Sequence, residues 1–160
     1  QISTGEMLRD EIKNETNIGK KIINYMNEGK FVDDNIVNKL IKEVIFDPQK
    51  KNKLIFDGYP RSLEQAKNLD MMLADSNQKI NFIFFLNVSK DIIIQRIEKR
   101  KILEKRSDDE LDTILKRYDT YMETTKPVLS YYSNKTNFNE IDGGLKITEI
   151  TDKINSILRV

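Results

Sequence analysis

The sequence contains no cysteine and no histidine, and each absence excludes a class of site. Without cysteine there is no disulfide framework and no zinc site built on thiolates. Without histidine the chain lacks the commonest general base that works near neutral pH. Any chemistry in this chain must therefore rely on other side chains and on the backbone.

The chain also lacks a large excess of either charge and a long apolar run. Its 27 lysine and arginine residues nearly balance 26 aspartate and glutamate residues, which disfavours nucleic-acid binding through bulk charge. No apolar run approaches the roughly 20 residues of a membrane span, and the first residues lack the apolar region of a signal peptide. We therefore expect a cytoplasmic protein without nucleic-acid or membrane partners. Its 160 residues, with no repeat or long linker, predict one domain.

Residues 53–61, Lys-Leu-Ile-Phe-Asp-Gly-Tyr-Pro-Arg, predict a short buried strand followed by a turn. Gly58 permits a backbone conformation that other residues resist, and Pro60 ends the strand. Ligands bind at the carboxyl ends of strands in open parallel sheets, which makes Asp57 and Arg61 candidates for function. The carboxylate could hold a metal ion, and the guanidinium could bind a phosphate. Taken alone, the same pattern also fits an ordinary strand–turn–helix connection whose charges face water.

Several serine residues stand three positions before a glutamate or glutamine, which is the spacing of a capping box at a helix start. These pairs are Ser3 with Glu6, Ser62 with Gln65, and Ser107 with Glu110. Apolar residues at helical spacing predict further helices over residues 17–27 and 34–45, and Asp33 is the expected cap of the second. We expect Pro127 to break or kink the long helix that precedes it.

Two further apolar runs predict strands. Residues 81–88 are nearly all apolar, which is typical of a strand covered on both faces, and residues 138–142 form the third strand. Gly143 and Gly144 then form a turn into a final amphipathic helix. Strands that alternate with helices predict an α/β fold, with a parallel sheet between helical layers.

The motif Phe-Asp-Gly-Tyr-Pro-Arg at 56–61, followed by Gln65 and preceded by Ser-Thr-Gly-Glu-Met-Leu-Arg at 3–9, resembles the nucleoside monophosphate kinases, and adenylate kinase most closely. The resemblance covers the whole chain and implies a three-layer α/β/α, P-loop NTPase-like fold. It implies a monomer that uses Mg²⁺ to transfer phosphate reversibly from ATP to AMP, giving two ADP. The family begins with a strand, a glycine-rich P-loop and a helix, about 30 residues in all. The printed sequence starts after the place where that unit would end.

The resemblance also implies an AMP-binding subdomain at about residues 3–46. Thr4 would contact the adenine base, Arg9 would bind the phosphate, and Gln65 would read the edge of the base. The implied AMP-binding residues are Thr4, Gly5, Arg9, Lys30, Phe31, Val32, Gly58, Tyr59, Pro60, Arg61, Gln65, Arg106 and Arg117. From the residues alone, Ser3 with Glu6 also fits a plain helix start, and Gln65 also fits the cap of its own helix. One rotamer of Gln65 cannot fully serve both purposes.

The charged residues at about 96–117 follow the family's pattern of Arg, a lid, Arg-x-Asp-Asp and Arg. The implied catalytic residues are Arg61, Arg96, Arg100, Arg106, Asp108, Asp109 and Arg117, while Arg96, Arg100 and Leu145 would bind ATP and Asp57 would hold Mg²⁺ through water. Only five residues separate Arg100 from Arg106, so we expect the short form of the lid, without a zinc site. Charge alone also fits a solvated helical hairpin.

Two alternatives remain open from the sequence. The first is a sister kinase that acts on UMP or CMP, against which Thr4 and Gln65 argue. The second is a nucleotide-binding protein without transferase activity, because the printed residues contain no P-loop.

Overall fold

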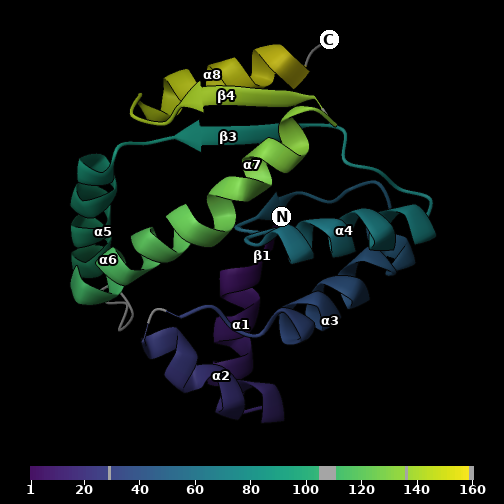
Figure 1. The fold of residues 1–160 in the computed structure, drawn as a ribbon, viewed down its shortest axis with the longest axis horizontal. Coiled ribbons are helices and arrows are strands. Elements are labelled where there is room, and N and C mark those ends of the chain that lie inside the picture. The colour runs from purple at the N-terminus through teal and green to yellow at the C-terminus, as the bar shows by residue number, and fades with distance from the viewer. Residues whose placement is uncertain (29, 105–110, 136, 159–160) are drawn as a thin grey trace.

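The computed structural model describes residues 1–28, 30–104, 111–135 and 137–158, which form an α/β fold (Figure 1). The elements in order are β1 (Ile2–Ser3), α1 (Thr4–Lys13), α2 (Asn17–Asn27), α3 (Asp34–Ile45), a 3₁₀ turn (Pro48–Lys50), β2 (Phe56–Asp57), α4 (Leu63–Asp75), β3 (Ile83–Asn87), α5 (Lys90–Glu104), α6 (Leu111–Thr120), a π-helical turn (Tyr121–Thr125), α7 (Lys126–Ser133), β4 (Phe138–Asp142) and α8 (Ile147–Leu158). None of the described helices is long and apolar enough to cross a membrane.

The first helices begin where the capping residues predicted them. Ser3 Oγ accepts a hydrogen bond from the Glu6 amide at 3.4 Å, and Ser62 Oγ accepts one from the Gln65 amide at 3.1 Å. Asp33 caps α3 in the same way, and the predicted bounds of α2 and α3 are confirmed. Each cap satisfies an amide that has no partner inside its own helix.

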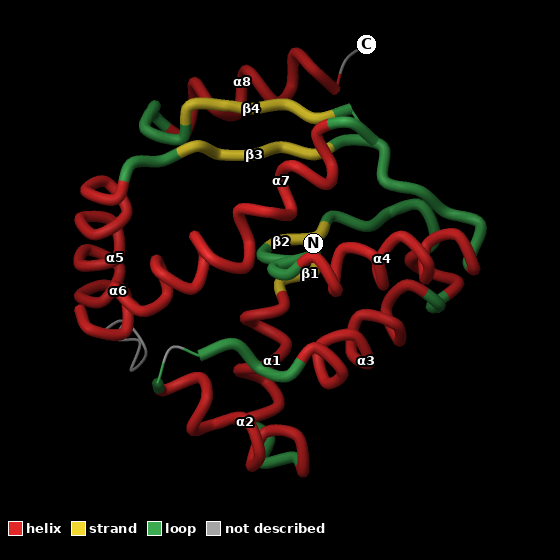
Figure 2. Tube along the Cα trace, viewed as in Figure 1, coloured by secondary structure: helices red, strands yellow, loops and turns green. Residues whose placement is uncertain are grey.

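The strands pair in parallel, as predicted, but their ladders are short. In the described residues β1 pairs with β2 and β3 pairs with β4, as two separate sheets (Figure 2). The strand predicted over 53–56 pairs only from Phe56, and Ile55 is 67% exposed, so the prediction of a buried strand there was wrong. The strand predicted over 81–88 spans β3, and Leu86 is 45% exposed. The expected cover on both faces of β3 is therefore incomplete at its carboxyl end.

The main core lies among α1, α2, α3 and α4; in Figure 1 the first three lie below β1 and α4 lies to its right. The most deeply buried large side chains are Ile22, Ile41, Ile45 and Leu69. Burying each of them contributes about 1.5–3 kcal/mol. The apolar stripes read from the sequence of α2 and α3 thus pack against α1 and α4 and fix the starts of those two helices.

Pro127 does not end the helix but changes the hydrogen-bond pattern of the turn before it. Because proline has no amide hydrogen, it cannot donate to the carbonyl four residues earlier. The turn before it widens into the π-helical segment Tyr121–Thr125, and the backbone angles remain helical on both sides, at Thr120 and Lys126. The helix therefore runs on from α6 into α7, which packs against α4 through Val128 and Tyr132.

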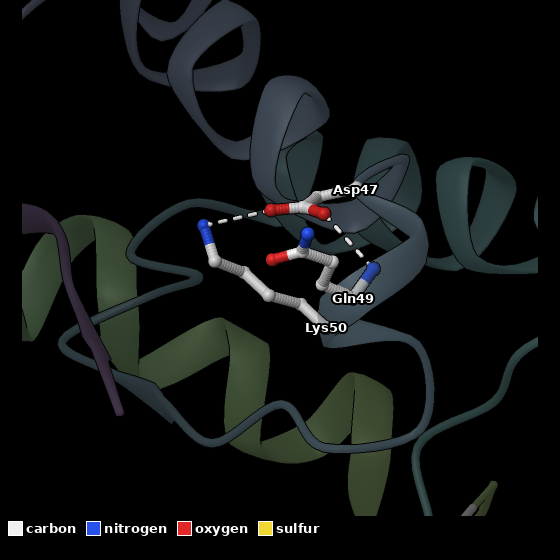
Figure 3. Close-up of polar contacts among 3 residues, drawn as sticks. All are labelled: Asp47, Gln49 and Lys50. Atoms are coloured by element: carbon white, nitrogen blue, oxygen red, sulfur yellow. Dashed lines mark hydrogen bonds and ion pairs between the residues drawn. The ribbon is translucent and has the colours of Figure 1, made fainter.

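The connection from α3 to β2 is held by a local polar contact (Figure 3). Asp47 Oδ1 accepts a hydrogen bond from the Gln49 amide at 2.9 Å, and Asp47 Oδ2 lies 3.1 Å from Lys50 Nζ. The Gln49 amide, and after it Lys50, lowers the pKa of the Asp47 carboxyl. This cap starts the 3₁₀ turn that redirects the chain toward β2.

Candidate active site

The candidate site lies at the carboxyl ends of β1 and β2, near the centre of the molecule (Figure 2). In the parallel register Ser3 faces Asp57, so both strands end at the same level. Helix α1 follows β1 directly, and α4 follows β2 after the turn 58–62. Two helix N-termini, with their unpaired amides, therefore start beside one strand edge.

Gly58 determines the shape of this turn. Its φ of +66° is a conformation that L side chains rarely adopt, and a Cβ there would lie 2.7 Å from Arg61 Nη2. The Gly58 carbonyl accepts hydrogen bonds from Thr4 Oγ1 at 3.0 Å and from Arg61 Nε at 2.7 Å. The glycine thus joins the start of α1 to the arginine of the turn. Thr4 is buried, and its hydroxyl donates to the chain while its oxygen can still accept a hydrogen bond.

Arg61 is held at its backbone and at its side chain. Its amide donates to Gln65 Oε1 at 2.7 Å, and its carbonyl accepts from Thr125 Oγ1 in the π-helical turn at 2.8 Å. Its guanidinium lies over the Phe31 ring, 5.6 Å from the centroid, besides its bond to the Gly58 carbonyl. Contacts from four segments of the chain therefore fix this arginine in place.

Three arginines and one carboxylate influence one another at this point. Loss of hydration, followed by the positive charges of Arg117 and Arg9, lowers the pKa of Arg61, and the Asp57 carboxylate opposes this shift. A Cβ at Gly5 would lie 3.3 Å from Arg9 Nη1, which places that guanidinium against the first turn of α1. The Arg61 guanidinium is therefore within electrostatic reach of positive charges on α1 and α6. An anion such as a phosphate relieves their repulsion.

Gln65 is almost fully buried, at 3% exposure, and belongs to a polar network between α3 and α4. Its Nε2 donates to Asp34 Oδ1 at 2.5 Å, while Ser62 Oγ donates to Asp34 Oδ2 at 2.7 Å. The side chain therefore does not return to the amide of its cap, Ser62, as a full capping box would require. Next to this network Tyr59 donates to Asn38 Oδ1 at 2.7 Å. Burial, and after it the Asp34 charge, raises the pKa of Tyr59.

The segment between α2 and α3 supplies one predicted residue to the arginine site. Phe31 contacts the Arg61 guanidinium, and Val32 is buried in the core. Lys30 instead pairs at the surface with Glu28, at 2.7 Å. Of these three predicted AMP contacts, Phe31 is the one that meets the arginine cluster in the described part of the chain.

Those predicted lid residues that the structure describes lie on α5 and α6, which stand side by side at the left of Figure 1. Arg96 and Arg100 are one helical turn apart on α5, and Arg117 is on α6. Lys90 lies over the Tyr118 ring, 4.8 Å from its centroid, and joins the two helices. The predicted residues Arg106, Asp108 and Asp109, and the capping pair Ser107 and Glu110, lie outside the described residues.

Asp57, the carboxylate predicted to take part in metal binding, lies in the part of the chain that the structure describes. It is exposed at the end of β2, and its Oδ2 accepts a hydrogen bond from Gln1 Nε2 at 2.8 Å. In the described part of the chain no three acidic side chains gather as a metal cage. One carboxylate suits Mg²⁺, which keeps several waters and takes its other ligands from substrate phosphates. Leu145, the predicted contact of ATP adenine, is half-buried in the turn that follows β4.

The sequence did not single out two residues that hold this site together. Asp34 looked like an ordinary acidic residue in the first turn of α3, where it suits the helix dipole. Thr125 looked like an ordinary helical residue before Pro127. Both act on residues far away in the sequence, Asp34 on Gln65 and Thr125 on Arg61. Local patterns carry no signal for such contacts.

Comparisons with known proteins find similar sequences. The sequence model of the family "Adenylate kinase" matches residues 1–137. Adenylate kinase of Pelagibacter ubique is 45% identical over 186 aligned positions, which include 100% of this chain and 87% of that protein. Adenylate kinase of Azobacteroides pseudotrichonymphae is 40% identical over 163 positions, covering 99% and 85% of the two chains. The first alignment is longer than this chain of 160 residues, so the Pelagibacter protein has residues within it that this chain lacks.

Proposed function

This chain belongs to the adenylate kinase family, and we propose that it binds AMP on the arginines at the β1–β2 edge and transfers the terminal phosphate of ATP to it, reversibly, giving two ADP. Membership makes the chain a nucleoside monophosphate kinase with the P-loop NTPase-like α/β fold. The observation that carries the proposed phosphate site is Arg61, held by Gln65 and Thr125 and exposed to the positive charges of Arg9 and Arg117. Nothing in the comparisons favours a kinase of other nucleotides or a protein without transferase activity.

Phosphoryl transfer depends on positioning and on neutralising charge, which explains why the chain needs no histidine. Arg9 and Arg61 would hold the AMP phosphate, with the amide of Gly5 at the start of α1 as a further donor. Arg117, at the same cluster, would stabilise the group as it moves between the two nucleotides. Arg100 and Arg106 would close on the phosphates of ATP and Arg96 would complete the cluster, while Asp108 and Asp109 would position the lid and its arginines.

The base of AMP would lie against the starts of α1 and α4. Thr4 and Gln65 are the proposed base contacts there, and the backbone of Lys30, Phe31 and Val32 would form the wall from the AMP-binding subdomain, about residues 3–46. Gly58, Tyr59 and Pro60 would shape the floor of the site. Leu145 would lie against the adenine of ATP.

We expect Thr4→Ala to relax the choice of base more than it slows transfer. The change removes a hydroxyl oxygen that can accept from the base, and also the bond to the Gly58 carbonyl. Because a neutral hydrogen bond is worth about 0.5–1.5 kcal/mol, the ratio of kcat/KM for CMP to that for AMP should rise about 2- to 12-fold. Thr151→Ala is the matched control, since Thr151 Oγ1 donates to Ile147 on exposed α8. An unchanged ratio in the Thr4 variant would show that Thr4 does not read the base.

Mg²⁺, when bound, supplies positive charge between the phosphates of ATP. The exposed Asp57 carboxylate would hold it through water, and the other ligands would be water and phosphate oxygens. Removal of Mg²⁺ should therefore abolish ADP formation, and its return should restore it.

A zinc-selective chelator should leave activity unchanged, because the sequence offers no cysteine or histidine for zinc. The measurement is the rate of ADP formation after each chelator. Loss of activity on zinc removal would contradict the short lid. That lid would span about residues 96–117. We further propose that the protein acts as a monomer in the cytoplasm.

A further inference from the structure

Both ends of the Gln65 amide have partners of fixed polarity. Arg61 N–H can only donate, and it contacts Gln65 Oε1 at 2.7 Å. The Asp34 carboxylate, when ionised, can only accept, and it contacts Gln65 Nε2 at 2.5 Å. A flipped amide would set donor against donor at Arg61 and acceptor against acceptor at Asp34. The two partners therefore determine which way the amide points.

Asp34 is itself well placed for this task. It is the first residue of α3, and its second carboxylate oxygen accepts from Ser62 Oγ at 2.7 Å. Ser62 in turn caps α4, the helix whose first turn contains Gln65. One carboxylate thus ties the start of α3 to the start of α4. The contact is half-buried, which weakens competition from water.

We propose that Asp34 is a positioning residue that fixes the polarity of the Gln65 amide and thereby makes the site select adenine over hypoxanthine. The amide retains one N–H on Nε2 and one lone pair on Oε1 for a ligand. That pair matches adenine, which offers an acceptor at N1 and a donor at its amino group. Hypoxanthine offers the reverse, a donor at N1 and an acceptor at O6. The inference rests on the proposed role of Gln65 in reading the base.

The test compares AMP with inosine monophosphate as acceptors in the full-length enzyme. In Asp34→Asn the side chain keeps its shape but can donate as well as accept, so of the two contacts that oppose a flipped Gln65 amide only the one with the Arg61 N–H remains. We expect the ratio of kcat/KM for inosine monophosphate to that for AMP to rise about tenfold, which corresponds to one neutral hydrogen bond. Asp33→Asn removes the same charge from the neighbouring cap, where asparagine caps equally well, and should leave the ratio unchanged.

Two further variants distinguish a failure of base reading by Gln65 from a failure of positioning by Asp34. Gln65→Ala should bring the two acceptors closer together, and if it leaves the ratio at the parental value, Gln65 does not read the base. If Gln65→Ala changes the ratio and a folded Asp34→Asn does not, the positioning role of Asp34 is overturned while base reading stands. Should Asp34→Asn fail to fold, Ser62→Ala removes the other donor to the carboxylate and should raise the ratio less but in the same direction. A parental ratio in folded Ser62→Ala would then overturn the proposal.

Discussion

Replacing Arg61 with alanine should lower kcat/KM for AMP by about 10- to 150-fold, because a hydrogen bond to a charged group contributes about 1.5–3 kcal/mol. The amide of Arg61 is bonded to Gln65, its carbonyl to Thr125 and its guanidinium to Gly58 of its own turn. Alanine keeps the backbone bonds to Gln65 and Thr125, so the turn should keep its path. The loss of kcat/KM should therefore come from weaker binding of the AMP phosphate.

Two comparison variants make the Arg61 result specific. Arg61→Lys keeps the charge but not the planar fork, so it should retain part of the activity. Lys67→Ala removes one positive charge from an exposed position on α4, and should have little effect. Thermal unfolding of each variant separates a binding effect from a loss of fold. Parental kcat/KM in Arg61→Ala would mean that the phosphate binds elsewhere.

Replacing Gly19 with valine should destabilise the protein by about 3 kcal/mol or more, the upper end for overpacking, since the obstructing atoms belong to the backbone. A Cβ at this position would lie 2.1 Å from the Glu11 carbonyl oxygen and 2.8 Å from Ile12 Cα. Only a shift of α2 away from α1 can relieve such a clash. Because α1 carries Thr4 and Arg9, the same shift should also weaken AMP binding.

The free energy of unfolding in urea, compared with that of the parent, is the measurement for Gly19→Val. Lys20→Ala is a suitable control, because Lys20 is an exposed neighbour on the same helix and alanine favours the helix. A loss below about 1 kcal/mol in the valine variant, a typical cost of any substitution, would show that the two helices do not meet as closely as the structure has them.

The parts of the fold that the sequence predicted well depend on interactions between residues close together in the chain. Helices α2 and α3 have the predicted bounds, because an apolar stripe and a capping residue are both read within one helix. Strand bounds were less accurate at β2, where Ile55 is apolar and β-prone yet exposed. A strand forms where a partner strand is in reach, and that depends on tertiary structure.

The candidate site likewise contains residues that the sequence predicted and residues that it did not. Arg61 could be found because a strand, a turn and an arginine follow one another in the chain, and the family resemblance gave it a role. Asp34 and Thr125 could not, since each contacts a residue that is distant in sequence. The close approach at Gly19 was hidden too, because a glycine in a predicted helix gives no sign of the backbone beside it.

The most direct measurement of the central claim is a panel of acceptors, AMP, CMP and UMP, assayed with ATP and Mg²⁺ in the full-length enzyme. The panel compares kcat/KM for formation of the diphosphates. If Thr4 and Gln65 read adenine beside the phosphate held by Arg9 and Arg61, AMP should exceed both pyrimidine nucleotides by at least about tenfold, the equivalent of one hydrogen bond. Equal or better kcat/KM with CMP or UMP would contradict the assignment of AMP as the acceptor.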